Sequence, residues 1–232
     1  MSTENARRSL LATDAAGIVA AKTSRTDMPL KIATPERLLA FSDGAFAVII
    51  TILVLDLRPP HDASWEALLA EWPTAVSYAV SYLFVAIVWI NHHYILNFAD
   101  SATPRLIWVN FAHLFTVSLL PFSTAWIAET HLAAGIPVCV YATVFFLANL
   151  SYISLCRELV DRPDREAVSS RMRASMRFRA SATLFVFPIA AIVALWQPLV
   201  GFGLVCCCIV PYLRPQAPGL ESRPARRESS PV

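Results

Sequence analysis

The sequence has few of the features that mark soluble enzymes. Only 16% of its 232 residues are charged, whereas 56% are hydrophobic and the mean hydropathy is +0.53. That composition is typical of a membrane protein and excludes an ordinary soluble domain. The sequence has no G-x-S-x-G nucleophile motif, no Walker phosphate loop and no paired intramembrane carboxylates. Because no motif supports catalysis, we expect a protein that is not an enzyme.

Metal-binding patterns are also missing. The five cysteines form no C-x-x-C pair, and no H-x-x-x-H or E-x-x-H pair occurs. Only His92 and His93 are adjacent, and neighbouring positions on a helix point about 100° apart, which makes a shared ion difficult. We therefore expect neither a metal site nor a cofactor.

Glycine is scarce, with six residues in the whole chain. The chain shows no internal repeat of the transporter type, and the T-V-G-Y-G filter of carbonyl-lined potassium channels is absent. The arginine-rich stretch 157–179 is most simply a determinant of membrane topology that contacts anionic lipid, so we expect no nucleic-acid partner.

What the sequence does contain is a series of long apolar segments. Each is of the length that a helix needs to cross a bilayer, except the last, which is short. They predict an all-α membrane protein with six transmembrane helices at about residues 37–57, 74–98, 104–127, 132–156, 174–196 and 199–212. Ser64 is a plausible N-cap of a short surface helix between the first two spans. Pro59 and Pro60 are expected to close the first helix.

The basic residues indicate the orientation of these spans. All but one of the 19 lysines and arginines fall on the same side of a six-span topology, the exception being Arg58. The positive-inside rule therefore predicts that both termini are cytoplasmic. We divide the chain into a disordered cytoplasmic arm (1–33), a six-helix transmembrane domain (34–213) and a disordered cytoplasmic tail (214–232).

The first span carries the most informative pattern. On a helical wheel, one stripe of this span is apolar apart from a threonine and an arginine at its base, and it contains Arg37, Phe41, Gly44, Ala45, Val48, Thr51, Ile52 and Leu55. Asp43 falls on the opposite side. A carboxylate inside an apolar span is costly and needs partners. Asp43 must find them on neighbouring helices.

The topology brings other polar residues to the depth of Asp43. These are Ser42, His92, His93 and Asn110, with Trp89 one helical turn away as a possible wall of the cluster. Hydrogen bonds from histidine and asparagine are the natural remedy for a carboxylate in a low dielectric. The simpler hypothesis is that this network only joins three helices. The sharper one is that it orients a conducting helix or senses protonation.

The quoted residues resemble a known family. R-x-x-x-F-S-D (37–43) followed by G-A-F-A-V-I-I-T-I-L-V-L-D-L resembles the first-helix signature of the transmembrane protein 175 family of potassium channels, in its bacterial branch. W-I-N-H-H (89–93), W-V-N (108–110) and L-L-P-F (119–122) resemble the second and third helices of that family. The likeness is specific over the first three spans and general over the last three.

The resemblance implies a homotetramer in which the first helix of each subunit lines a central pore without a carbonyl filter. It implies that Val48 forms the hydrophobic gate, that Thr51 contributes to potassium preference, and that Ile52 and Leu55 form further apolar rings. The structural polar network is implied to comprise Arg37, Ser42, Asp43, Trp89, His92, His93 and Asn110. Val48 is smaller than the leucine or isoleucine usual at the gate, which implies a weakly gated, leak-like pore.

Three functions remain open at this stage. The first is a potassium channel of the bacterial inner membrane, with K⁺ as the permeant ion. The second is a proton-conducting or proton-coupled transporter that uses Asp43, His92 and His93, although these residues all lie near one face. The third is a membrane scaffold without conduction, or a small membrane enzyme.

Overall fold

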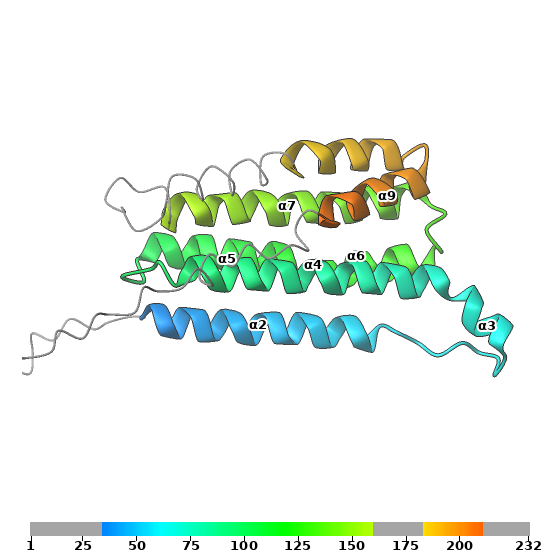
Figure 1. Ribbon diagram of the computed structural model, residues 1–232, viewed down its shortest axis with the longest axis horizontal. Helices are drawn as coiled ribbons and strands as arrows, with labels where there is room; N and C mark the ends of the chain where they lie inside the picture. The colour runs from blue at the N-terminus through cyan, green and yellow to red at the C-terminus, as the bar shows by residue number, and fades with distance from the viewer. Residues whose placement is uncertain (1–33, 160–182, 211–232) are drawn as a thin grey trace, which may run out of the picture. The chain divides into compact units, whose positions relative to one another are not determined.

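The computed structural model describes residues 34–159 and 183–210, which form helices joined by turns and short loops (Figure 1). The helices are α2 (Pro35–Leu55), α3 (Trp65–Ala70), α4 (Trp72–Leu96), α5 (Pro104–Ser118), α6 (Leu120–Glu129), α7 (Gly135–Leu159), the helix Thr183–Ala194 and α9 (Pro198–Ile209). The predicted terminal arm and tail, and most of the predicted basic loop, lie outside the described residues.

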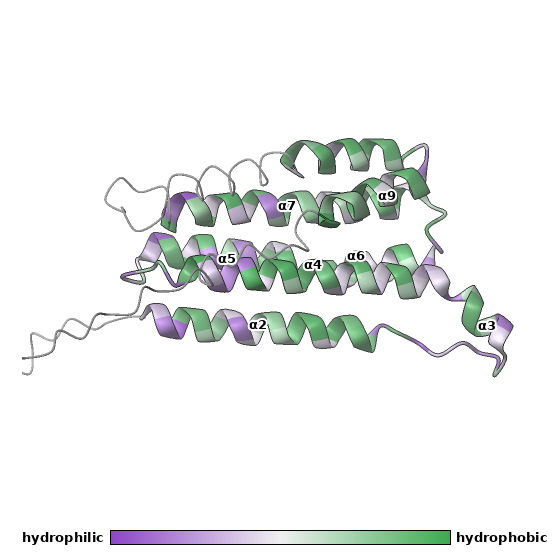
Figure 2. Cartoon of the chain, in the orientation of Figure 1, coloured by the Kyte–Doolittle hydropathy of each residue, from purple (hydrophilic) through white to green (hydrophobic). Residues whose placement is uncertain are grey.

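Four segments are long and apolar enough to cross a membrane. They are Pro35–Leu55, Trp72–Leu96, Pro104–Glu129 and Gly135–Leu159. Hydrophobic residues, coloured green, predominate along these segments (Figure 2). Of the last two predicted spans, the structure describes the shorter apolar helices Thr183–Ala194 and Pro198–Ile209. The described chain is therefore an all-helical protein with four candidate membrane spans.

Several predicted helix ends were wrong by a few residues. α2 ends at Leu55 and not at the prolines 59 and 60. α4 begins and ends two residues earlier than predicted, and α7 begins three residues later. The late start of α7 follows from His131 and Leu132, which have φ angles of 48° and 58° and close the end of α6 in the left-handed region.

The third span was predicted as one continuous helix, and the structure divides it into α5 and α6 at Leu119. Pro121 lies in the first turn of α6. Because proline has no N–H to donate and its ring crowds the carbonyl one turn earlier, the helix cannot continue unbroken through this position. The two pieces together still form one membrane-length segment.

α2 lies at one edge of the helical arrangement (Figure 1). It packs against α4, α5 and α6, whereas α7 packs against α4, α5, α6 and α9. The main core lies around α7, where the Phe84 and Phe145 rings stack with centroids 3.9 Å apart. Within the same core, Ser81 hydrogen-bonds Thr124 at 2.7 Å and Tyr141 at 2.8 Å, which ties α4 to α6 and α7.

α9 approaches the helix Thr183–Ala194 so closely that a larger residue at Gly201 should destabilise the protein. A Cβ atom at Gly201 would lie 2.6 Å from the Ala194 Cβ atom and 2.8 Å from the Ala190 carbonyl oxygen, whereas one at Gly203 meets nothing within 4 Å. Gly201→Ala should therefore lower the free energy of unfolding by about 1–3 kcal/mol through overpacking. Thermal unfolding of the purified protein in detergent measures this, with Gly203→Ala as the matched control. Equal stability of the two variants would contradict the packing described here.

Candidate functional site

α2 has a buried face and an exposed face. Its buried residues recur at helical spacing and are Leu38, Ser42, Phe46, Ile49 and Leu53. This face packs against α4, α5 and α6. The exposed face of a membrane helix normally contacts lipid and is apolar. Polar groups on such a face therefore indicate a function.

The predicted stripe lies on the exposed face of α2. Val48 is 56% exposed, Ile52 42% and Leu55 78%, and Thr51 is also exposed. A Cβ atom at Gly44 would have nothing within 4 Å, so the middle of the stripe is open. The described residues of the chain therefore do not cover this flank.

The Thr51 side chain is oriented by its own helix. Its hydroxyl donates a hydrogen bond of 2.8 Å to the Val48 carbonyl oxygen. Because the single hydroxyl proton is used in this bond, Oγ1 has only lone pairs to offer to the exposed face. An oxygen presented in this way can ligate a cation. Thr51 is thus the one polar side chain among the four stripe residues at this level.

The predicted polar network separates into two groups, and the first is buried. Asn110 on α5 donates from Nδ2 to Ser42 Oγ at 3.0 Å, and its Oδ1 lies 2.7 Å from His92 Nε2. Ser42 in turn donates to the Leu38 carbonyl oxygen at 2.9 Å. Ser42, His92 and Asn110 are fully buried. This chain of hydrogen bonds joins α2, α4 and α5.

The second group is half exposed. Trp89 Nε1 donates to Asp43 Oδ1 at 2.8 Å, and His93 Nδ1 lies 3.6 Å from the same oxygen. All three side chains are partly open to the surface. Trp89 is therefore a hydrogen-bond donor to the Asp43 carboxylate. Asp43 finds its partners on α4, a neighbouring helix.

The remaining residue of the predicted network is Arg37. It is exposed at the N-terminal end of α2, on the same flank as Val48. The structure thus brings together six of the seven network residues in two sets and leaves Arg37 on the stripe.

Sequence reasoning missed a further set of buried polar residues. His113 on α5 is fully buried, its Nδ1 lies 2.9 Å from Ser151 Oγ on α7, and Ser151 Oγ lies 2.9 Å from Thr116 Oγ1. The His113 and His92 rings stack with centroids 5.6 Å apart and planes 9° apart. The only signal in the sequence was a lone histidine within an apolar helix, which by itself does not reveal a partner on another helix.

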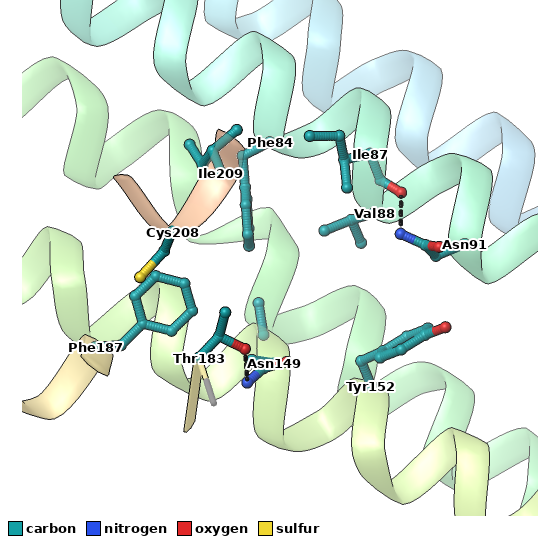
Figure 3. A pocket seen from close by; sticks show the side chains of 11 residues that line it. Phe84, Ile87, Val88, Asn91, Asn149, Tyr152, Thr183, Phe187, Cys208 and Ile209 are labelled. Atoms are coloured by element: carbon teal, nitrogen blue, oxygen red, sulfur yellow. Dashed lines mark hydrogen bonds between the residues drawn. The ribbon is translucent and has the colours of Figure 1, made fainter. Parts of the chain in front are cut away.

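Two concave regions lie away from the stripe. A cavity of about 40 Å³ lies between α4, α7, the helix Thr183–Ala194 and α9 (Figure 3). Its lining is mainly aliphatic and aromatic, and the Asn149 amide donates to Thr183 Oγ1 at 2.9 Å (Figure 3). Its size allows only a few methylene groups, so it is not a conduction path.

A larger polar cavity of about 280 Å³ lies at the C-terminal end of α2. It is bounded by the loop after α2, the start of α4 and the end of α6, and it is lined by Asp56, Arg58, Pro59, Pro60, His61, Glu71, Thr74, Ala125, Ala128, Glu129 and His131. Its lining carries three carboxylates, Asp56, Glu71 and Glu129, and one arginine, Arg58.

Comparisons with known proteins agree with this arrangement. Residues 37–121 match the family model "Endosomal/lysosomal potassium channel TMEM175". A potassium channel from Chryseobacterium sp. (strain P1-3) is 29% identical over 170 residues, which are 73% of this chain and 88% of that protein. An endosomal/lysosomal proton channel TMEM175 from Gallus gallus is 28% identical over 100 residues, which are 38% of this chain and 20% of that protein.

A solved structure has the same fold. It is the crystal structure of a lysosomal potassium-selective channel TMEM175 homolog from Chamaesiphon minutus, with a TM-score of 0.64 and 23% identity, covering 77% of this chain and 96% of that chain. The fold and these matches define a multi-pass membrane protein of the ion-channel class. Over residues 37–121 the chain is similar to the TMEM175 family.

Proposed function

We propose that this protein is a potassium-selective, weakly gated channel in which α2 of each subunit lines a central pore. The observation that carries the proposal is the exposure of Val48, Thr51, Ile52 and Leu55 on one flank of a membrane-length helix whose opposite face is packed. The bacterial relative from Chryseobacterium is named a potassium channel, which supports K⁺ as the permeant ion.

The proposed gate is hydrophobic. A ring of Val48 side chains narrows the path, and water and ions leave a constricted apolar tube by dewetting. The Thr51 oxygen lies one turn further on, with its lone pairs free for a cation. We assign potassium preference to the Thr51 ring and further apolar constrictions to Ile52 and Leu55.

The assembly proposed is a homotetramer with six spans per subunit, in the inner membrane of a bacterium. The N-terminal arm (1–33) and the tail (214–232) are proposed to be disordered and cytoplasmic, on either side of a transmembrane domain at 34–213. No cofactor is part of the proposal. The polar network is proposed to hold the packed face of α2, so that its other flank faces the axis.

The alternative is a proton-conducting protein that uses Asp43, His92 and His93. The name of the Gallus gallus relative as a proton channel favours it. A relay needs a continuous series of groups, however, and here His92 is buried against Asn110 while Asp43 and His93 are half exposed. That separation weighs in favour of the potassium channel.

Reconstituted flux tests the proposal. Purified protein in liposomes should give a reversal potential that follows the K⁺ gradient and ignores an opposed pH gradient. Thr51→Val, which keeps the shape and removes the oxygen, should lower the preference for K⁺ over Na⁺ by about tenfold, which corresponds to about 1.4 kcal/mol of lost ligation. Thr143→Val is the matched control, since Thr143 is exposed on α7 and bonds its own helix backbone. A reversal potential that follows the pH gradient would overturn the proposal in favour of the alternative.

A further inference from the structure

Within the part of the chain that the structure describes, each of the two stacked histidines in the helical core has one ring nitrogen with a hydrogen-bond partner and one without. His92 on α4 and His113 on α5 are both fully buried. Each has one ring nitrogen in a hydrogen bond. The other two nitrogens, His92 Nδ1 and His113 Nε2, are buried and have no hydrogen-bond partner among the described residues. Buried polar atoms are nearly always paired, so these two atoms need an explanation.

The partners of His92 identify which of its nitrogens carries the proton. The Asn110 amide nitrogen donates to Ser42, so the atom that faces His92 is the Asn110 carbonyl oxygen, which can only accept. His92 must therefore donate from Nε2. In the neutral ring, Nδ1 is then a bare acceptor with its lone pair in the ring plane.

The same reasoning applies to His113. The Thr116 hydroxyl donates to the His113 carbonyl oxygen at 2.8 Å, and the Ser151 hydroxyl donates to the Ala148 carbonyl oxygen at 2.9 Å. The Ser151 hydroxyl has a single proton, and its oxygen acceptors are the Ala148 carbonyl and Thr116 Oγ1, each at 2.9 Å. With the Ser151 proton on either of these oxygens, His113 donates from Nδ1 to Ser151 and Nε2 is a bare acceptor.

We propose that the His92–His113 pair is a buried binding site for a ligand from solution. The ligand is either a water molecule, which donates a hydrogen bond to a bare nitrogen, or a proton, which binds to it. The two bare nitrogens are acceptors without donors, which is what such a ligand supplies. A shared metal ion fits poorly because lone pairs of nearly parallel rings run in parallel planes and do not converge. Nor do the described residues offer a group of three metal-binding side chains.

The site takes at most one full positive charge. Two imidazolium rings with centroids 5.6 Å apart repel each other strongly away from water, so a proton on one ring excludes a proton on the other. The titratable groups around the pair are Asp43 from α2, His93 from α4 and Tyr152 from α7, the last with its ring 6.1 Å from His113.

The position of the pair connects it to α2. His92 is linked through Asn110 to Ser42, and the Phe46 ring of α2 covers both histidines at 5.2 Å and 6.5 Å. A charge on His92 would strengthen its bond to Asn110, since hydrogen bonds from ionised donors are shorter and stronger. A proton on His92 should therefore strengthen the hydrogen-bonded link that holds α2 to α4 and α5.

Two substitutions separate this site from the packing role of the same rings. His113→Asn keeps a donor near the Nδ1 position for Ser151 and removes the Nε2 acceptor. His92→Gln keeps a donor near the Nε2 position for Asn110 and removes the Nδ1 acceptor. Both retain the hydrogen bonds that join the helices while deleting the bare nitrogen.

The experiment is solid-state NMR of the full chain labelled with ¹⁵N-histidine in liposomes, from about pH 8 to about pH 5. We expect the Nε2–H tautomer for His92 and the Nδ1–H tautomer for His113. A cross-peak between water and a bare nitrogen identifies water as the occupant, and conversion of at most one of the two rings to imidazolium identifies a proton. Each signal should be lost in the variant that removes the corresponding nitrogen.

Opposite tautomers would overturn the proposal. So would bare nitrogens that show neither a water contact nor protonation over the whole pH range. Because this measurement needs no ion flux, its result is independent of whether the protein conducts potassium.

Discussion

Val48→Asn is expected to raise K⁺ flux through the reconstituted protein by about tenfold or more, the change that a barrier lower by about 1.4 kcal/mol produces. Val48 is exposed on the flank proposed to face the pore axis. Asparagine is close to valine in size but carries an amide that holds water, so a ring of asparagines keeps the constriction wet. Liposome flux with a K⁺-dependent membrane potential measures the change.

The same helix provides a matched control for that substitution. Val54 is 47% exposed, close to the value of 56% for Val48, but it lies on a different flank of α2. Val54→Asn should leave flux near the wild-type level, although an amide facing lipid has its own cost in stability. If both variants raise flux, or neither does, the assignment of the Val48 flank to the pore is wrong.

Asn110→Leu is expected to lower the free energy of unfolding by about 2–4 kcal/mol. The substitution removes the acceptor for His92 Nε2 and the donor to Ser42 Oγ, both in fully buried positions. A buried donor that loses its partner costs about 1–3 kcal/mol, and the lost bond to Ser42 adds to this. Thermal unfolding in detergent measures the effect, and flux should fall with it because α2 loses its anchor.

Asn91→Leu is the control for this prediction. The Asn91 amide donates to the Ile87 carbonyl oxygen of its own helix, so its removal breaks no bond between helices. We expect a loss below about 1 kcal/mol, the net value of a typical hydrogen bond. The double variant Ser42→Ala with Asn110→Leu should be less destabilised than the sum of the two single variants, since the residues share one network. Equal destabilisation by Asn91→Leu and Asn110→Leu would show that the buried network does not hold α2.

The stripe on α2 illustrates what a single helix reveals. Val48, Thr51 and Leu55 fall on one side of a helical wheel because helix geometry is the same wherever the helix packs. The structure exposes that side and buries the opposite one, as the wheel had separated them. The role of these residues in conduction stays a prediction.

The polar network illustrates the limit of such reasoning. Topology placed Ser42, Asp43 and His92 at a similar depth, but depth does not say which residues face each other. That depends on the rotation of each helix, which is set by packing of many side chains at once. For this reason the division into a buried group and a half-exposed group, and the donor role of Trp89, emerged only from the structure.

By itself, the sequence determined that this is a multi-pass helical membrane protein, and which flank of its first span is apolar, since these depend on composition, length and periodicity within one segment. Only the tertiary structure decided that His113 stacks on His92, that the third span breaks at Leu119, and that Asp43 binds Trp89. The physical reason is that two side chains on different helices meet only when both helices are rotated to face each other and both residues lie at the same depth. No single segment contains that information.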